Sequence, residues 1–572
     1  MVVDWRYLMY VREVRVFGFK QFLNLCVKLS PGINIVVGDN DAGKTTLLEA
    51  VNAVLNGQYR GVSLTRNLSE DLFNDTLVDN YKNKINSKEF CSPPEINIEV
   101  VFDSDNNEDD GILALYEGDS NSRRIKESGV SLKIALDSDS FADEYQKFVN
   151  AQDCFGIPIE YYSCVWSTFA RKVIRPVGLK FKSSMIGNGH SLVWNNSRAF
   201  ISRITKDVLD SDDQIHISQV QRKLKKQFTD DTEIKRINDK ISDRTNSLTR
   251  KSVTLGFESG TINSWENDIV TKLQDIPFAN VGDGTKSIVA TELALARSKD
   301  RHRGLVLLEE PENHLSHTRL NMFLDDIRNR CAGMQLVVTT HSSFVANKLE
   351  LRKLILLNGN KTTSLSELRA DTSNFFMKAP GYKTLRVLLC RVSILVEGDA
   401  DELIVQRAYR DRYGKLPIQD GIDVIAVGTS FLRFLEIAKK IGKDVVAVTD
   451  NDGNPDVLDS KYREYCYVAS EKACDAHQVV SYEKEIRDDG KYGSLNYNTL
   501  ESEIYLSADK EVLSQILGRS TCDRDETLKY MESNKTEVAL KIFETKDCIA
   551  YPDYIVRAIE WAHVKAGLES NV

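Results

Sequence analysis

The chain has 572 residues, which at about 150 residues per domain predicts roughly four structural units. Hydrophobic residues make up 42% and charged residues 28%, so the composition excludes a chain that is disordered throughout. The 75 basic and 84 acidic residues give a net charge of −9, which excludes a uniformly basic nucleic-acid binder but not a local basic groove.

The cysteines and the hydropathy profile bear on location. None of the ten cysteines belongs to a CxxC pair, so we expect reduced thiols rather than a disulfide framework or a zinc site. No segment approaches the roughly 18 apolar residues that cross a bilayer, and the first residues contain no signal-peptide core. We therefore expect a cytoplasmic protein with no membrane partner.

The first predicted elements lead into and out of a glycine-rich loop. Residues 11–17 and 23–29 alternate apolar and polar positions and predict strands, and the apolar run 33–37 is typical of a buried strand. A helical pattern follows at 46–55, and another strand is predicted at 95–103.

The chain changes character between about 195 and 255. Sparse apolar residues in a charged background predict polar helices that project from the main body or pack against a partner. Apolar strands at 304–308 and 335–342 alternate with helices, which predicts a largely parallel sheet. A second α/β unit begins near residue 391. Its expected elements are strands at 392–396, 422–427 and 443–450, a helix at 401–410 and a mainly helical tail from about 500 to 572.

The glycine-rich loop fits the pattern G-x-x-x-x-G-K-[ST] between a strand and a helix, which predicts an ATP-phosphate site. Glycines let backbone amides turn toward phosphate oxygens, the lysine reaches the β- and γ-phosphates, and the first threonine hydroxyl is placed to bind Mg²⁺. The candidate ATP-binding residues of this loop are Gly38, Asn40, Gly43, Lys44, Thr45 and Thr46.

The strand that begins at Gly304 ends in two carboxylates. Glu309 is placed to complete a Mg²⁺ shell, and Glu310 to orient or deprotonate the attacking water as a catalytic residue. His341, at the end of the next strand, is a candidate γ-phosphate contact. The alternatives are a solvated acidic rim and a structural histidine.

A second loop that opens a helix lies at 280–287, and it offers another anion site with small residues, Gly282, Gly284 and Thr285. Two such loops rarely converge on the same phosphates from one sheet, so this loop serves the same nucleotide only if chains pair.

A second group of acidic residues follows two later strands. Glu397 ends one strand and Asp401 lies about one helical turn further on, while Asp450 and Asp452 end another strand and project to the same side. Four carboxylates at the ends of parallel strands form a hard-oxygen cluster that suits Mg²⁺ or Mn²⁺. The alternative is an acidic rim without a metal.

The order of these motifs resembles known families. The glycine loop, the Gly-x-Gly-Thr loop, the Glu-Glu-Pro strand and the Thr-His-Ser strand resemble the ABC-type ATPase heads of the SMC and RecF group, although Glu309 stands where most of these carry Asp. The resemblance implies a homodimer or higher homo-oligomer in which residues 282–286 of one copy cap ATP on the other.

The set E-G-x-x-D, a middle glycine at 428 and D-x-D resembles a Toprim domain, and its position after an ABC-type ATPase resembles the OLD (overcoming lysogenization defect) nucleases. The implied fold class is α/β, with an ATPase head that carries a helical insertion, then a Rossmann-like Toprim domain and a helical C-terminal segment. The resemblance adds Glu501 as a further metal ligand and Lys546 as a lysine near the scissile phosphate, with an exposed helical lysine as the alternative for Lys546.

The resemblance implies hydrolysis of DNA by two divalent ions, held by Glu397, Asp401, Asp450, Asp452 and Glu501, with ATP as a further cofactor. It also implies a role in defence against phage, and some relatives work with a helicase-like protein or a reverse transcriptase. Two alternatives stay open: a DNA-binding ATPase clamp with a non-catalytic Toprim module, and a sensor in which ATP restrains cleavage. Candidate DNA contacts, or solvated faces, are Arg222, Lys223, Lys225, Lys226 and the basic residues of 171–182.

The predicted domain organisation has five parts. They are an N-terminal ATPase lobe at 10–195, a helical insertion and dimerisation element at 196–255, a C-terminal ATPase lobe at 256–385, the Toprim domain at 391–500 and a helical part at 501–572 that completes the nuclease site.

Overall fold

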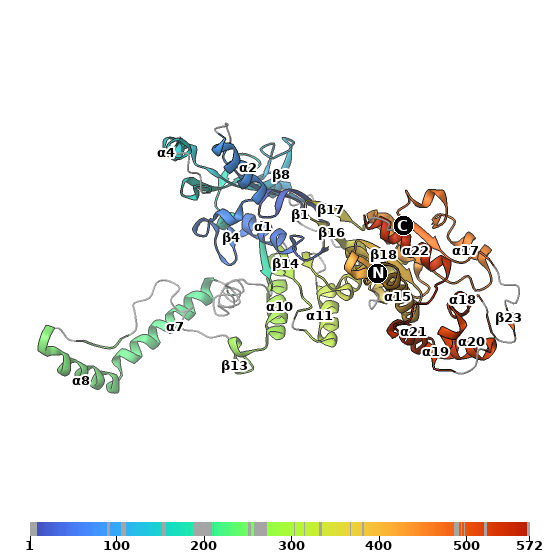
Figure 1. Cartoon of the computed structure of the whole chain (residues 1–572). Helices are drawn as coiled ribbons and strands as arrows, with labels where there is room; N and C mark the ends of the chain where they lie inside the picture. Colours follow the sequence, from blue (N-terminus) through green and yellow to red (C-terminus); the bar gives the residue numbers. More distant parts are fainter. Residues whose placement is uncertain are drawn as a thin grey trace. The chain divides into compact units, whose positions relative to one another are not determined.

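A computed structural model (Figure 1) describes residues 9–87, 92–104, 110–150, 156–187, 209, 211–249, 253–256, 272–301, 304–313, 315–330, 334–366, 368–379, 383–485, 491–492, 495–496, 498–519 and 523–568. Contacts divide the chain into two compact units, Met1–Asn34 with Gly43–Thr339, and Ile35–Ala42 with Thr340–Val572. The limits of the five predicted domains stay predictions. Among the described residues, no helix combines the length and apolar character needed to span a bilayer.

The first unit contains an antiparallel sheet with the strand order β10-β9-β8-β6-β1-β2. Its strands are β1 (Tyr10–Phe19), β2 (Phe22–Lys28), β6 (Ile96–Asp103), β8 (Glu127–Leu136), β9 (Tyr162–Thr168) and β10 (Val173–Ile174), and the short β7 (Glu117–Gly118) pairs with β8. The helix α1 (Lys44–Asn56) contacts β6 and β8 and is buried along almost its whole length. The sequence did not predict the antiparallel pairing of these strands, because alternation within a strand does not specify its partner. The parallel sheet was expected from the strands at 304–308 and 335–342, and those two strands do pair in parallel.

The same unit contains three parallel strands, β11 (Lys182–Ile186), β14 (Gly304–Glu309) and β15 (Gln335–Thr339), paired in that order. The continuous apolar runs of β14 and β15 are buried, as expected for strands covered on both faces. The helices of this region are α10 (Asp283–Arg301) and α11 (His317–Arg330).

Within the described part of the segment between 195 and 255, two polar helices are present, α7 (Ser211–Asp230) and α8 (Thr232–Thr249) (Figure 1). Most residues of this segment on either side of them lie outside the described part of the chain. The two helices meet at Asp231, whose carboxylate accepts the Glu233 amide at 2.8 Å at the start of α8.

The second unit begins with β3 (Ile33–Val37), whose residues from Ile35 onward pair in parallel with β16 (Leu354–Asn358), and β16 pairs in an antiparallel sense with β17 (Lys361–Ser364). Three short helices belong to this part of the chain, one before β16 and two between β17 and the next sheet. They are α12 (Ser343–Lys348), α13 (Ala370–Lys378) and α14 (Thr384–Leu389).

A five-stranded parallel sheet with the order β19-β18-β20-β22-β21 forms the rest of the second unit. The strands are β18 (Val392–Val396), β19 (Ile422–Ala426), β20 (Asp444–Val448), β21 (Cys466–Tyr467) and β22 (Gln478–Ser481). Their helices are α15 (Asp399–Tyr413), α16 (Phe431–Ile441) and α17 (Pro455–Lys461), and the predicted helical tail consists of α18 (Leu500–Ser507), α19 (Lys510–Leu517), α20 (Arg524–Ser533), α21 (Lys535–Glu544) and α22 (Asp553–Lys565). The α/β class expected from the sequence is confirmed.

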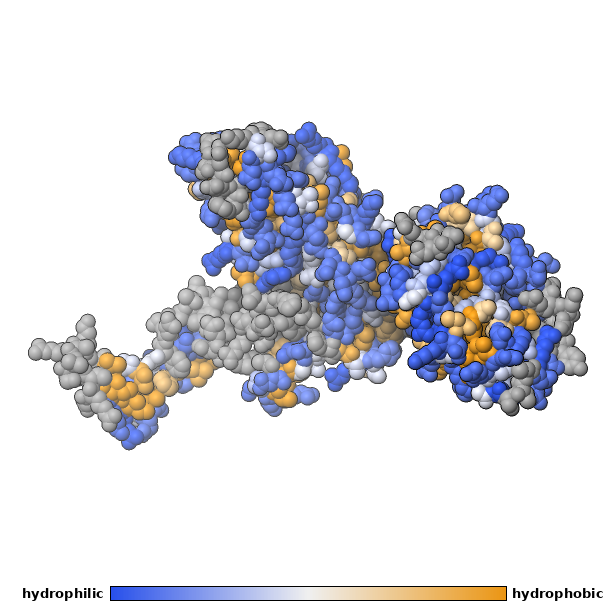
Figure 2. Space-filling view, viewed as in Figure 1, coloured by the Kyte–Doolittle hydropathy of each residue, from blue (hydrophilic) through white to orange (hydrophobic). Residues whose placement is uncertain are grey.

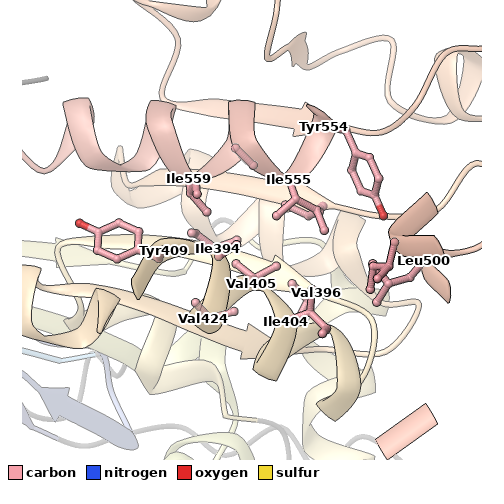
Figure 3. Close-up of a cluster of buried hydrophobic side chains, with 14 of the residues drawn as sticks. Ile394, Val396, Ile404, Val405, Tyr409, Val424, Leu500, Tyr554, Ile555 and Ile559 are labelled. Atoms are coloured by element: carbon pink, nitrogen blue, oxygen red, sulfur yellow. The ribbon is translucent and has the colours of Figure 1, made fainter. Parts of the chain in front are cut away.

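One hydrophobic cluster ties the helical tail to this parallel sheet (Figure 3). It combines Ile394 and Val396 of β18 with Ile404 of α15, Leu500 of α18 and Tyr554 of α22, all of them buried. Leu500 and Tyr554 lie at the same end of the cluster. The tail is therefore part of the same core as the sheet, and this packing sets where the side chains next to Leu500 lie.

Candidate functional site

The glycine-rich loop has the backbone geometry that its sequence predicts. Gly43 has φ +98°, and a Cβ atom there would lie 2.3 Å from the Phe22 ring. A Cβ atom on Gly38 would lie 2.5 Å from the Leu357 carbonyl oxygen. Only glycine fits either position, and α1 begins directly after the loop at Lys44, as in phosphate-binding loops that end at a helix N-terminus.

The structure brings the two halves of the predicted Mg²⁺–nucleotide site together within the first unit. The Thr45 hydroxyl donates to the Glu309 carboxylate, which is buried at the end of β14. Glu310 has φ +43°, its amide donates to the Thr339 carbonyl at 2.9 Å, and its carboxylate accepts the Asn313 side-chain amide at 2.8 Å. Both carboxylates are thus fixed in position, and their roles in catalysis stay predictions.

The other nucleotide candidates lie in separate places. Thr46 is buried and donates to Gln21, so its side chain faces the interior. The helix α10 begins at Asp283, inside the segment 280–287 that was predicted as a loop. Gly284 and Thr285 therefore lie in the first turn of this helix. The Thr285 hydroxyl accepts a bond from Arg319 of α11 at 3.3 Å. His341 is exposed in the second unit, between β15 and α12.

The predicted metal ligands of the second unit lie at the carboxyl ends of its central strands. Glu397 follows β18 and is exposed, and the Asp401 carboxylate accepts the Gly398 amide at 3.0 Å in the first turn of α15. Asp450 follows β20 and accepts the Leu500 amide at 3.0 Å and the Tyr554 hydroxyl at 3.2 Å. Asp452 is exposed with φ +49°.

The carboxylates of the second unit are close enough to influence one another's pKa. Burial raises the pKa of Asp401 to about 6, and the neighbouring Glu501 and Glu397 carboxylates add to the shift. Burial also raises the pKa of Asp450 well above its usual value, with further contributions from Asp401, Glu501 and Asp452. That these carboxylates together hold a metal ion stays a prediction.

Glu501 has an unusual environment in this cluster. Its side chain is 6% exposed on α18, and its Oε1 pairs with Lys535 Nζ at 3.0 Å, whereas its Oε2 is buried without a hydrogen-bond partner. A buried carboxylate oxygen without a partner is costly, and a cation is one way to satisfy it. The donor set therefore fits a hard divalent cation, although in the described part of the chain no three acidic, histidine or cysteine side chains already stand as a metal shell.

Lys535 is a residue that sequence reasoning missed. Burial lowers its pKa, but the facing Glu501, Asp450 and Asp401 carboxylates raise it above the usual lysine value. It lies at the start of α21, far along the chain from the acidic motifs, and no motif marks it. The lysine predicted instead, Lys546, lies exposed after α21 ends at Glu544, where no hydrogen bond or ion pair joins it to the carboxylates.

The basic candidates lie on the surface of the first unit. Arg222, Lys223 and Lys226 are exposed on α7, and Lys225 is partly buried there. Arg171 is exposed but pairs with Asp119 at 2.8 Å, so part of its charge is already balanced.

Comparisons with known proteins bear on both units. A family profile described as an AAA domain matches residues 13–276, and one described as "Overcoming lysogenization defect protein-like, TOPRIM domain" matches 388–452. The DNA replication and repair protein RecF of Clostridium perfringens is 37% identical over 43 residues, which are 8% of this chain. The RecF protein of Symbiobacterium thermophilum is 38% identical over 55 residues, or 10% of this chain. The matches span only 12% and 15% of the lengths of these two relatives.

Solved structures give weak global matches to the same kinds of protein. The recombination mediator RecF with ATP matches with a TM-score of 0.31 and 13% identity, over 63% of this chain and 100% of that one. The C-terminal region of the Burkholderia pseudomallei OLD protein matches with a TM-score of 0.24 and 19% identity, over 31% of this chain and 98% of that one. By the family profiles, the chain carries an AAA ATPase domain followed by an OLD-like TOPRIM domain.

Proposed function

We propose that the chain is an ATP-regulated, divalent-metal-dependent DNA endonuclease of the OLD type, which nicks or cleaves. The observation that carries the proposal is the partnerless, buried Glu501 Oε2 beside the coupled carboxylates of Asp401 and Asp450. The cluster lies at the carboxyl ends of the sheet strands, where ligands bind in open α/β sheets. The OLD-like TOPRIM profile covers Glu397, Asp401, Asp450 and Asp452, and it ends before Glu501.

Mg²⁺ or Mn²⁺ held by Asp401, Asp450 and Glu501, with Glu397 and Asp452 at the exposed side, would supply Lewis-acid activation of water. The protein's own groups have separate tasks. Tyr554 and the Leu500 amide hold the Asp450 carboxylate in one orientation. Lys535 is half exposed and can meet a phosphate oxygen from solvent while it balances Glu501.

ATP chemistry belongs to the first unit in this proposal. Lys44 and the amides at the start of α1 would hold the phosphates, Thr45 and Glu309 the Mg²⁺, and Glu310 the attacking water. A role of His341 as a γ-phosphate contact stays a prediction from the sequence. The segment with Gly282, Gly284 and Thr285 would complete the site of a second copy of the chain.

The helices α7 and α8 support self-association and DNA binding. Figure 2 shows a hydrophobic patch on these helices, and its exposed side chains include Val220, Leu224 and Ile237. Exposed apolar side chains in such a row are typical of an interface. The neighbouring Arg222 and Lys223 would contact DNA phosphates, and each such contact adds to the salt dependence of binding.

The test is nicking of supercoiled plasmid with Mg²⁺ or Mn²⁺, with and without ATP. Asp450→Asn keeps the size of the side chain but removes the charge, and we expect it to lower nicking at least about 100-fold while ATP hydrolysis continues. The matched control is Asp456→Asn, an exposed aspartate on α17, which should nick as the wild type does. Normal metal-dependent nicking by Asp450→Asn would reject the site.

A second function is an ATP-driven DNA clamp whose TOPRIM unit is not catalytic. The exposed basic side chains of α7, which lie outside the TOPRIM unit, favour it. Plasmid that stays supercoiled under every metal and nucleotide condition, with DNA-stimulated ATP hydrolysis that Lys44→Ala abolishes, would support the clamp. The phage-defence role that the OLD resemblance implies is tested separately, by whether wild-type but not Asp450→Asn protein lowers plaque formation.

A further inference from the structure

A continuous set of polar contacts runs through the second unit from the segment after β15 toward the nuclease carboxylates. The segment starts at Thr340, whose amide donates to the Val36 carbonyl of β3 at 3.1 Å. His341 follows, and Ser342 then accepts the Val345 amide at 3.4 Å with its side chain and so begins α12. The exposed His341 is therefore held between the sheet and a fixed helix start.

Two hydrogen bonds join α12 to α14. The buried Thr384 hydroxyl donates to the buried Asn347 side chain at 2.7 Å. The Leu385 amide donates to the Ser343 hydroxyl at 3.1 Å. Because buried polar groups lose free energy without their partners, these bonds make the start of α14 follow α12.

Arg386, the next residue of α14, carries the contacts to the TOPRIM sheet. Its Nε and Nη2 donate to the two carboxylate oxygens of Asp423 on β19, at 2.7 and 2.5 Å, and Nη2 also donates to the Val424 carbonyl at 2.9 Å. Nη2 also lies 3.5 Å from the carboxylate of Glu402 in the first turn of α15. A planar guanidinium with this bidentate geometry fixes orientation as well as distance.

Glu402 connects this arginine to the predicted metal site. It is the neighbour of Asp401 in the same helical turn, and its Oε2 accepts the Ala426 amide at the end of β19 at 3.4 Å. A shift of α14 that carries Arg386 therefore acts on Glu402 and on the turn that holds Asp401. Packed elements of this kind change between discrete arrangements rather than deform continuously.

We propose that Arg386 is a positioning residue that transmits nucleotide occupancy at loop residues 38–42, which follow β3, through the Thr340–Ser342 segment to the turn that holds Asp401. The proposal rests on the proposed function for its two ends, the phosphate-binding loop after β3 and the metal ligand Asp401. It adds the route between them, α12, α14 and Arg386, and it assigns to this arginine a role that neither site requires for its own chemistry.

The experiment compares full-length wild type, Arg386→Gln and Arg386→Lys, with Arg412→Gln as the matched control. Arg412 pairs with Glu560 in the same unit, away from α12 and α14. Two responses to a non-hydrolysable ATP analogue with Mg²⁺ are measured: the ratio of nicking rates with and without the analogue, and the change in hydrogen–deuterium exchange of peptides that cover 397–404 and 422–428. ATP hydrolysis is measured in parallel to show that the nucleotide site is intact.

We expect the analogue to change wild-type nicking by about fivefold or more, in either direction, and to change exchange in both peptides. In Arg386→Gln both responses should fall to within about twofold of no effect, while ATP hydrolysis is retained. Arg386→Lys should also lose most of the response, because a lysine lacks the planar guanidinium that donates two parallel hydrogen bonds to Asp423. Arg412→Gln should respond as the wild type does. If Arg386→Gln does not fold, Ser343→Ala replaces it in the comparison. This substitution removes the hydroxyl that accepts the Leu385 amide and so breaks one hydrogen bond between α12 and α14.

The outcomes separate this proposal from the proposed function. A full nucleotide response in Arg386→Gln or Arg386→Lys, or no exchange response in the wild type, overturns the coupling role even if plasmid is nicked. A wild-type protein that never nicks plasmid but shows the exchange response, lost in Arg386→Gln, supports the coupling role and rejects the nuclease.

Discussion

Replacement of Lys535 by methionine separates metal binding from catalysis at the carboxylate cluster. Lys535 Nζ lies 3.0 Å from Glu501 Oε1, and its charge also acts on Asp450 and Asp401. In the absence of metal the lysine is a resident cation that competes with Mn²⁺ for the same carboxylates. Methionine keeps most of the aliphatic length and removes the charge, so the variant should bind Mn²⁺ more tightly and nick more slowly.

The magnitude follows from Coulomb's law with a solvent discount. Two unit charges about 6 Å apart interact by about 0.7–3 kcal/mol for effective dielectric constants from 80 to 20. Because the Lys535 side chain is 49% exposed, the lower part of that range applies, and we expect about 1 kcal/mol, or about fivefold tighter Mn²⁺ binding. Loss of a positive charge beside the phosphate should lower the nicking rate by about 10- to 100-fold.

Mn²⁺ affinity is measured calorimetrically without nucleotide in a Thr45→Val, Glu309→Gln background, which removes the two metal ligands predicted in the ATP site. Lys546→Met is the matched control, because this exposed lysine makes no ion pair in the structure, and both its Mn²⁺ affinity and its nicking rate should stay unchanged. Weaker Mn²⁺ binding by Lys535→Met, or an unchanged nicking rate, would refute the reasoning. Slow nicking by Lys546→Met instead would favour Lys546, the lysine predicted from the sequence, as the residue near the scissile phosphate.

Three further predictions test the ATP site, the acidic cluster and the tail. Thr45→Val removes the hydroxyl that donates to Glu309, and phosphate release should fall at least about 10-fold while the fold is kept. The pKa of Asp401 is raised from 3.8 to about 6, so the contribution of this group to folding stability is present below about pH 4 and is lost as the pH rises through 6. Thermal unfolding in EDTA measures this loss. Between about pH 5 and 7.5 the wild type should lose more stability than Asp401→Asn. Arg407 is 2% exposed and donates to the carbonyls of Ile542 and Asp547 at 2.7 and 2.9 Å, so Arg407→Met should destabilise the second unit by about 3 kcal/mol, seen as a lower urea midpoint.

Local patterns predicted the elements that positioned each motif, because such patterns record burial. The strands 33–37 and 392–396 appear in the structure with the same limits, since continuous apolar runs are buried on both faces. The antiparallel sheet of the first unit was not predicted. Its strands alternate as expected, but the partner and direction of a strand depend on contacts that a single strand does not encode.

The same distinction applies to the site. Glu397, Asp401, Asp450 and Asp452 could be found because each ends a strand or begins a helix, and chain order alone places such ends along one edge of a parallel sheet. Lys535 is the first residue of a separate helix, α21, and only the packing of the tail on the sheet brings it to Glu501. A residue that only tertiary packing brings to a site has no local sequence pattern that marks it. Lys546 was predicted from a family resemblance, and in the structure no hydrogen bond or ion pair joins it to the carboxylates.

The arrangement of charge in the second unit argues for function over stability. Desolvation and mutual repulsion raise the pKa of both Asp401 and Asp450, and the backbone amides of Gly398 and Leu500 offset only part of this cost. Lys535 offsets part of one charge, and Tyr554 satisfies one oxygen of Asp450. A core selected for stability alone would place apolar side chains there, as the adjoining hydrophobic cluster does. In the proposed function, a bound cation would balance the remaining charge and the open Glu501 oxygen.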